Sequence, residues 1–422
     1  MIPLAFDELR ALGLGELEGH GDVTGVQIDS RRVRPGDLFV AVGGGVAFIG
    51  AARAAGAAAT LVPDDAFTAI ADIARLVRDR SSARVVGITG STGKTSTKDI
   101  LAALCGAVRR TVASEASFNN ELGVPLTVCR LEADTELLLV EMGMRGFGQV
   151  AELCAWVRPH AGVITAVGPA HLDRVGDVAG VARAKGELLV ALPPGGVAVV
   201  PAGVPELEPF LRDELDVRVV PPLDDVHVER GEAAATVHWN GRDVRLPLTA
   251  RHQLQNALTA LEAYAALGLP LDRVGEGAAR IEVSRWRGEE LPLAGGGVVI
   301  NDAYNANPTS MRAALLHLRE RAGDRRALAV LGGMAELGES SDRYHREAAA
   351  LARELGVDVL AVGELARAYG AADWVADAER AVERARAMLR PGDAVLVKAS
   401  RAVGLEGVAP ALAKVAGTWS ES

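Results

Sequence analysis

Residues 85–106 read VVGITGSTGKTSTKDILAALCG: a short apolar run, a turn of glycine, serine and threonine, and then a helix-like stretch. An apolar run of this length and composition predicts a buried strand, and the stretch after the turn predicts a helix. The backbone N–H groups of such a turn, together with the N-terminus of the following helix, can bind phosphate. This stretch therefore predicts a phosphate-binding loop inside an α/β fold.

The side chains of the turn fit that interpretation. Lys94 would reach the terminal phosphates of a nucleotide, and Thr95 would place its hydroxyl on Mg²⁺, which takes oxygen ligands. The general Walker A pattern needs glycine five positions before Gly93, where this chain has Ile88, so the match is to the shorter G-x-x-G-K-T form. A plain loop is the alternative, but the lysine and threonine between a strand and a helix favour phosphate binding. The predicted phosphate-binding residues are Gly90, Ser91, Thr92, Gly93, Lys94, Thr95 and Ser96.

The strand and helix pattern continues along the chain, where short Val/Ile/Leu runs alternate with amphipathic stretches. That alternation is typical of parallel sheets with crossover helices. It occurs in two series and predicts an α/β fold with more than one parallel sheet. The first series includes 85–89, 137–140, 162–165 and 197–200, and the second includes 298–300, 327–331, 359–362 and 394–397.

Residues 236–248 interrupt this pattern. Two short apolar stretches flank Asn240-Gly241, the dipeptide that best supports a type I′ hairpin turn. We therefore expect a small antiparallel addition to the central sheet. The next stretch, about 253–267, has apolar residues at helical spacing and stops at Gly268, a plausible left-handed residue after a helix.

The length of 422 residues predicts three domains at roughly 150 residues each. The polar segment 79–82 is a candidate hinge, and the glycines 295–297 mark a second junction. We expect an N-terminal domain over 1–82, a central domain over 83–292 and a C-terminal domain over 293–422.

The composition excludes several classes of protein. A net charge of -10 and an aromatic content of 4% argue against nucleic acid held by a basic or stacking surface. Cys105, Cys129 and Cys154 are odd in number and widely spaced, as expected of reduced, buried thiols in the cytosol. Acidic residues stand near the start where a secretory signal would be basic, and Pro193–Gly196 cut the apolar stretch 190–204, so we expect no export and no membrane span. We expect a cytoplasmic monomer.

Three further side chains are candidates for chemistry beside the phosphate loop. Glu141 ends an apolar run, which places a carboxylate at the carboxyl end of a strand, where it could bind Mg²⁺. His171 also follows a strand and could complete a metal site with Glu141. Taken alone, Glu141 would be a solvated strand end and His171 an ordinary loop histidine. For Lys185, the pattern alone favours a surface lysine paired with a neighbouring acid.

Residues 301–308 form a polar cluster, NDAYNANP, directly after a predicted buried strand. Its asparagines and aspartate offer donors and acceptors for a ribose or a base, and Tyr304 could stack on a base. A capped turn built from good turn formers explains the same composition equally well.

Taken in order, these motifs resemble the MurF family within the wider Mur ligase and folylpolyglutamate synthase superfamily. The phosphate loop, Glu141, His171 and Lys185 would fit any Mur ligase, whereas FNNELGVP at 118–125 and DAYNANP at 302–308 single out MurF. The other matching segments are 29–31, 35–39, 141–143, 168–171, 184–187, 252–256, 310–311, 334–338 and 397–401.

The resemblance implies three domains: one for a UDP-sugar, a central ATPase sheet and a Rossmann-like C-terminal domain that closes over the nucleotide. Thr95 and Glu141 would hold one Mg²⁺, and His171 with Lys185 a second, with Lys185 carbamylated into an anionic ligand. The implied catalytic residues are Lys94, Glu141, His171 and Lys185.

The resemblance also implies two sets of ligand contacts. Asn256, Arg287, Asp302 and Asn305 would contact ATP, which is a substrate. Asp29, Ser30 and Arg31 would face the uridine diphosphate, and Asn119 and Asn120 the UDP-muramoyl peptide.

The implied activity is ATP-dependent ligation of D-alanyl-D-alanine to UDP-N-acetylmuramoyl-tripeptide through an acyl phosphate. The alternatives are a sister Mur ligase that adds one amino acid, a folylpolyglutamate synthase, or a binding protein that uses ATP as a switch. The chain departs from the family in a shorter segment at 43–48 and at Ser117, Gly333 and Ala399.

Overall fold

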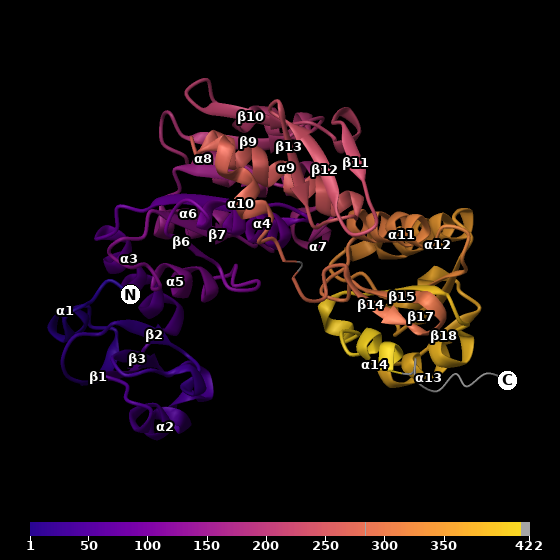
Figure 1. The fold of residues 1–422 in the computed structure, drawn as a ribbon. Coiled ribbons are helices and arrows are strands. Elements are labelled where there is room, and N and C mark those ends of the chain that lie inside the picture. Colours follow the sequence, from indigo (N-terminus) through magenta and orange to yellow (C-terminus); the bar gives the residue numbers. More distant parts are fainter. Residues whose placement is uncertain (283, 415–422) are drawn as a thin grey trace.

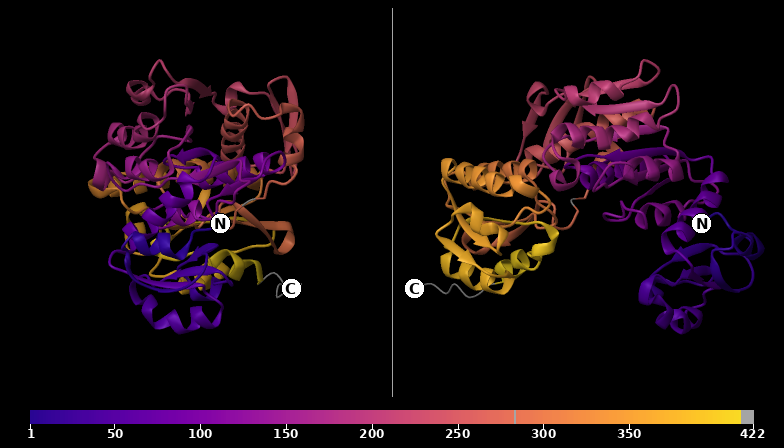
Figure 2. Two further views of the ribbon diagram at one scale, coloured as in Figure 1. Left: turned by 90° about the vertical axis from the view of Figure 1, so that its left-hand side faces the viewer. Right: turned by 180° about the vertical axis from the view of Figure 1, so that it is seen from behind.

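The computed structural model describes residues 1–282 and 284–414, so Val283 and the last eight residues of the predicted C-terminal domain lie outside the described residues. The chain forms three parts that follow one another along the sequence (Figure 1). The first and the third part extend from opposite ends of the central part and lie apart in Figure 1 and in the right-hand view of Figure 2.

The first part contains a four-stranded sheet in the order β1-β4-β3-β2. Strand β3 pairs in parallel with β2 and β4, while β1 is antiparallel to β4. Helix α3 buries Ile70, Ile73 and Val77 in a core that it shares with α5 and α6 of the central part, so this helix joins the first two parts. The elements are α1 (Phe6–Ala11), β1 (Gly15–Gly19), β2 (Gly25–Gln27), β3 (Asp37–Val40), α2 (Ile49–Ala54), β4 (Ala59–Pro63) and α3 (Ala66–Asp79).

The central part is built on a six-stranded parallel sheet in the order β10-β9-β8-β5-β7-β6. Successive side chains of a strand point to opposite faces, so Val85 packs toward α5, α6 and α8, and Val86 toward α4 and α9. Burial on both faces explains the unbroken apolar runs in the sequence. The strands are β5 (Arg84–Thr89), β6 (Thr111–Ala113), β7 (Leu137–Glu141), β8 (Ala161–Ile164), β9 (Val197–Pro201) and β10 (Asp216–Val220). The helices are α4 (Lys94–Gly106), α5 (Gly123–Val128), α6 (Gln149–Val157), α7 (Leu172–Val175), α8 (Val178–Val190), α9 (Arg251–Ala266) and α10 (Val274–Ala278).

The predicted hairpin is present, with Asn240 and Gly241 both at positive φ, but its predicted place was wrong. Strands β12 (Ala235–Trp239) and β13 (Arg242–Leu246) join β11 (Val228–Arg230) in a separate antiparallel sheet. The physical reason is that the apolar face of this sheet packs on α9, where Trp239 also donates a hydrogen bond to Glu262 at 2.7 Å. Face packing buries these side chains, whereas pairing with the edge of the central sheet would leave them exposed.

The third part has a six-stranded sheet in the order β14-β15-β19-β16-β17-β18, parallel except for β14. Helices α11 and α12 cover one face, and α13 and α14 cover the other, which is the expected Rossmann-like arrangement. The strands are β14 (Glu289–Leu293), β15 (Gly297–Asn301), β16 (Ala327–Gly332), β17 (Val357–Val362), β18 (Asp373–Val375) and β19 (Ala394–Lys398). The helices are α11 (Pro308–Ala322), α12 (Ser341–Glu354), α13 (Ala378–Met388) and α14 (Val408–Lys414).

The glycines 295–297 do not mark a junction between domains. Gly295 and Gly296, both at positive φ, form the turn between β14 and β15 within the third sheet. They are glycines because this tight turn needs φ values that residues with a Cβ rarely adopt. The passage from the central to the third part therefore comes earlier in the chain, before Glu289.

In the part of the chain that the structure describes, every helix is too short or too polar to cross a membrane.

Candidate active site

The predicted phosphate loop lies between β5 and α4, as the sequence indicates. Gly93 adopts a left-handed conformation (φ +81°) just before the first residue of α4. A Cβ at this position would collide with the side-chain oxygen of Asn256, so only glycine fits. The predicted nucleotide-binding residue Asn256, from α9, therefore lies directly against the loop.

Hydrogen bonds hold the loop to its neighbours. The Ser91 hydroxyl donates to the Gly168 carbonyl at 2.9 Å, and Thr165 donates to the Thr92 carbonyl. From the third part of the chain, the Asn307 amide donates to the Ser91 carbonyl at 3.0 Å. The loop is thus fixed from two domains.

Lys94 and Thr95 begin α4 at the predicted position. Lys94 donates to the Gly90 carbonyl at 2.8 Å, so its side chain folds back over the loop. Burial lowers the pKa of Lys94, the nearby Glu141 carboxylate opposes this, and the Arg287 guanidinium adds to it. Thr95 is only 3% exposed. The predicted nucleotide contact Arg287 therefore shares the electrostatic environment of Lys94.

Glu141 ends β7, the strand beside β5, and is 1% exposed, which rules out a solvated strand end. Its Oε1 atom accepts a hydrogen bond from Asn119 Nδ2 at 2.7 Å. Its Oε2 atom is buried, and no hydrogen-bond partner for it is found among the described residues. A buried carboxylate oxygen without a partner is unfavourable unless a cation or ligand binds it.

Lys185 on α8 is 2% exposed, so the interpretation as a surface lysine paired with an acid was wrong. The neighbouring Glu187 instead accepts hydrogen bonds from the backbone of Gly148 and Ala151, at 2.6 and 3.1 Å. Within residues 1–282 and 284–414, no acid forms an ion pair with Lys185. Burial and the positive charge of Lys94 hold the pKa of Lys185 well below its ordinary value.

His171 joins the central domain to the third domain. It adopts a left-handed conformation before α7, and its Nδ1 atom lies 2.6 Å from Glu336 Oε2. A hydrogen bond from His171 lowers the pKa of Glu336. A carboxylate beside Nδ1 is the arrangement of a histidine that binds a metal ion through Nε2.

The cluster 301–308 forms a capped turn, one of the two interpretations made from the sequence, and its contact with a ribose or a base stays a prediction. Asn307 caps α11 by accepting from the Ser310 backbone at 2.9 Å, as a capped turn would. Asp302 forms an ion pair with the buried Lys398 at 2.6 Å, and the Asn305 carbonyl accepts from the same ammonium at 2.9 Å. Tyr304 bonds to Ser117 of the central domain, and Arg287 lies over its ring at 3.9 Å.

The predicted substrate residues are not all brought to this site. Asn119 donates to Glu141, whereas the Asn120 side chain accepts from the backbone N–H of Gly123, the first residue of α5, at 3.0 Å. Asp29 accepts two side-chain hydrogen bonds from Arg31, at 2.9 and 2.7 Å, and these lower the pKa of Asp29 to about 2. Asp29, Ser30 and Arg31 lie in the first domain, and the side chains of Asp29 and Arg31 bond to each other.

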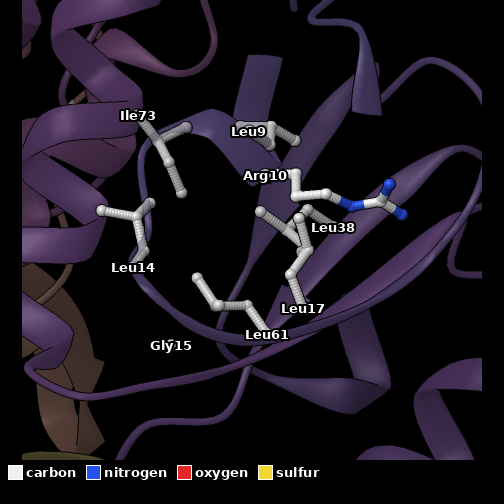
Figure 3. Close-up of a pocket in the computed structure, with 8 residues that line it drawn as sticks. All are labelled: Leu9, Arg10, Leu14, Gly15, Leu17, Leu38, Leu61 and Ile73. Carbon is white, nitrogen blue, oxygen red and sulfur yellow. The ribbon is translucent and has the colours of Figure 1, made fainter. Parts of the chain in front are cut away.

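The first domain also contains a small pocket, but this pocket is not a candidate site for a nucleotide sugar. It has a volume of about 90 Å³, and leucines and Ile73 surround it, with the Arg10 guanidinium turned away from its centre (Figure 3). Pockets for drug-sized ligands are typically 300–1,000 Å³. The pocket is therefore too small and too apolar for a UDP-sugar.

The sequence interpretation missed two residues of the site and the role of a third, Asn307, which lies in the predicted cluster 301–308. Glu336 pairs with His171, Lys398 pairs with Asp302, and Asn307 bonds to the phosphate loop. Glu336 and Lys398 lie within segments 334–338 and 397–401, which carry the family resemblance, so that resemblance was the available signal. Neither pairing has a local sequence pattern.

Comparison with known proteins identifies the family. The sequence model of the Mur ligase middle domain matches residues 88–264, and that of the Mur ligase glutamate ligase domain matches residues 286–401. UDP-N-acetylmuramoyl-tripeptide–D-alanyl-D-alanine ligase of Escherichia coli is 32% identical, over 98% of this chain and 99% of that protein. The chain belongs to the MurF family.

Solved MurF structures agree with this assignment. MurF from Acinetobacter baumannii superimposes with a TM-score of 0.82 at 27% identity, over 98% of this chain and 99% of the other. MurF from Thermotoga maritima in complex with ADP gives 0.80 at 26% identity, over 94% and 98%. The predicted MurF resemblance and the three-domain α/β architecture are thus confirmed.

Proposed function

We propose that this chain joins D-alanyl-D-alanine to UDP-N-acetylmuramoyl-tripeptide at the expense of ATP. The observation that carries this assignment is the match to the E. coli ligase of that name over 98% of the chain. The phosphate loop beside an incompletely bonded Glu141 agrees with it. ATP is a substrate, as the ADP-bound MurF structure supports.

The reaction follows from what the site can stabilise. A carboxylate oxygen of the tripeptide attacks the γ-phosphorus of ATP, the bond to the bridging oxygen breaks, and ADP leaves. The amine of D-alanyl-D-alanine then attacks the acyl carbon, loses a proton, and displaces inorganic phosphate. Charge neutralisation is the main requirement of such a transfer. Lys94 and the N-terminus of α4 provide it from the protein.

The donor set also fits magnesium. The unpartnered Glu141 Oε2 and the buried Thr95 would hold one ion, and His171 Nε2 with a modified Lys185 would hold a second. When bound, Mg²⁺ neutralises phosphate charge. Asn119 donates a hydrogen bond to Oε1 of Glu141 and would orient its carboxylate. Glu336 lies beside Nδ1 of His171 and would orient its imidazole.

We propose carbamylation for Lys185. Burial and the positive charge of Lys94 favour the neutral amine of Lys185, which can add to CO₂, lose a proton and become an anionic carbamate. Lys185→Ala should reduce ligation by about a hundredfold or more, and short carboxylates should restore part of it. Activity that is indifferent to Lys185→Ala, with or without added carboxylate, would contradict this proposal.

The remaining assignments are proposals of the same kind. Asn256, Arg287, Asp302 and Asn305 would contact ATP, since all lie at or beside the loop and the cluster that bonds to it. The first domain, with Asp29, Ser30 and Arg31, would bind the uridine diphosphate, and Asn119 and Asn120 would face the muramoyl peptide.

We keep the first domain boundary after Ser82 and place the second domain boundary between residues 281 and 289. A cytoplasmic monomer remains our expectation, and the three free, buried cysteines fit a reducing compartment.

The test is phosphate release with ATP and Mg²⁺, offering UDP-N-acetylmuramoyl-tripeptide with either D-alanyl-D-alanine or single amino acids, and identifying the product by mass. Release and a pentapeptide product only with the dipeptide are expected. Release only with a single amino acid would instead assign a sister ligase. Hydrolysis that needs neither further substrate would favour an ATP-driven switch.

A further inference from the structure

The small antiparallel sheet carries a histidine cluster that the ligase reaction does not use. Strand pairing places His227 opposite His238, and His238 opposite Asp243, with Glu229 two residues after His227. All four side chains lie on the outer face, because Val237, Trp239 and Val244 point inward to the core. Four ligating groups therefore share one face of three adjacent strands.

The nitrogen and oxygen atoms of this cluster converge. Glu229 Oε1 lies 3.9 Å from His227 Nε2 and 3.8 Å from His238 Nε2, and the two imidazole rings are 4.4 Å apart at a tilt of 31°. One ligand atom from each of the three residues lies within 4.8 Å of the other two. Atoms that each bind one zinc ion at about 2.0–2.1 Å lie closer to one another than the ligand atoms of this cluster do. Rotation of the side chains can bring them to that separation.

The second observation concerns the protonation pattern of His238. Its Nδ1 atom pairs with Asp243, which makes Nδ1 the donor and leaves a lone pair on Nε2. That Nε2 atom is buried, and no hydrogen bond to it occurs among the described residues, although Glu229 and His227 are beside it. A histidine held by a carboxylate at one nitrogen and free at the other is the usual form of a metal ligand.

We propose that His227, Glu229 and His238 bind a divalent transition-metal ion of the zinc type, with Asp243 orienting His238. Two imidazoles and a single carboxylate select zinc-like ions over Mg²⁺, whose sites are richer in oxygen ligands. The ion cross-links β11 to β12. Arg230 follows Glu229 in β11 and forms an ion pair with Glu320 of α11, so it joins the small sheet to the third domain. Figure 1 shows β11 beside α11 at this place.

The thiols of the chain do not compete for this ion. Cys105, Cys129 and Cys154 are buried, and burial raises the pKa of each to about 12, so thiolate is not available near neutral pH. The active site is the other competitor, since His171 and Glu141 could take zinc. Excess Mg²⁺ and a His171→Ala variant separate the two sites.

The experiment is isothermal titration of the full chain with Zn²⁺ in excess Mg²⁺. We expect one ion to bind, and binding to persist in His171→Ala and in His20→Ala, which removes an exposed histidine of the first domain. His227→Ala and His238→Ala should abolish it, and Asp243→Asn should weaken it by about 10–100-fold. Unchanged ligase turnover of His238→Ala in Mg²⁺ shows that this variant is folded.

Two results would overturn the proposal. One is Zn²⁺ binding by His227→Ala and His238→Ala with wild-type affinity, which would place the ion elsewhere. The other is the absence of any binding heat for the wild-type chain. A melting temperature that rises with Zn²⁺ in the wild type but not in His238→Ala would support the cross-link, because only binding to the folded state stabilises it.

Discussion

The central and C-terminal domains each bury a lysine near a parallel sheet, but they treat it differently. Lys398 ends β19 and is 2% exposed, and its ammonium pairs with Asp302 and with the Asn305 carbonyl. Lys185 is equally buried, yet no acid pairs with it in the described part of the chain, and its charged neighbour is Lys94. The charge of Lys398 is therefore balanced by an acid, whereas no acid in the described part of the chain balances a charge on Lys185.

This difference indicates a division of roles. A buried amine without an acid partner is costly to charge, so a fold keeps such a group where ligands or chemistry will complete it. The Lys398 and Asp302 pair instead fixes the loop 301–308, which reaches across to the phosphate loop through Asn307. We infer that the central domain performs the chemistry and that the C-terminal domain positions a rigid loop over it.

The largest expected effect is at the phosphate loop. Lys94→Ala should reduce ATP-dependent ligation by about a thousandfold or more, because it removes the cation nearest to the transferred phosphoryl group. Phosphate release in the complete reaction measures this loss.

Folding is the control for this variant, and circular dichroism with thermal melting should show a wild-type transition. Substantial turnover by a folded Lys94→Ala chain would remove the central domain from its proposed role.

The second test exchanges Lys185 and Lys398, one at a time, for methionine and measures stability without nucleotide or metal. Lys398→Met should destabilise the chain by about 3 kcal/mol, because it leaves the Asp302 carboxylate without its partner. Lys185→Met should be neutral or stabilising, since it removes a buried amine that has no acid partner. Denaturant midpoints measure both effects. Equal losses of stability in the two variants would erase the contrast between the domains.

The third test separates two adjacent asparagines of the central domain. Asn119→Ala should lower kcat by about 10–100-fold, because Asn119 holds the carboxylate of Glu141. Asn120→Ala should cost about 1 kcal/mol of stability, because it removes a hydrogen bond to the first N–H of α5, and should change kcat less. Steady-state kinetics at saturating Mg²⁺ together with thermal melts compare them. A larger kcat loss in Asn120→Ala would instead place Asn120 on the substrate.

The sequence predicted the features that local patterns encode. The strands, the phosphate loop and the Asn240-Gly241 turn all follow from short apolar runs and from residues that favour particular φ values. The burial of Lys185 was not predictable from its helix, because the structures that cover it come from elsewhere in the chain. The same holds for the separate hairpin sheet, which depends on which apolar face finds a partner. Glu336 approaches His171 only through the packing of two domains.

The smallest expected effect is at the contact between His171 of the central domain and Glu336 of the C-terminal domain. The hydrogen bond from His171 lowers the folded-state pKa of Glu336 below its ordinary 4.5. A carboxylate with a lowered pKa stabilises the fold above its unfolded pKa, and this contribution is lost as the pH falls through the folded value. Glu336 is 43% exposed and screened by solvent, so the contribution should not exceed about 1 kcal/mol.

The measurement is the melting temperature of wild type and Glu336→Gln from neutral to acid pH. The wild type should melt at a higher temperature near neutrality, and the difference should shrink as the pH falls below 4.5, the ordinary pKa of a glutamate, toward the lower pKa of Glu336 in the folded chain. Glu339→Gln, which changes a nearby carboxylate for which no ion pair is found among the described residues, is the matched control. A difference that stays constant into acid would mean that Glu336 acts through packing, and the ion pair would then not link the catalytic edge to the positioning domain.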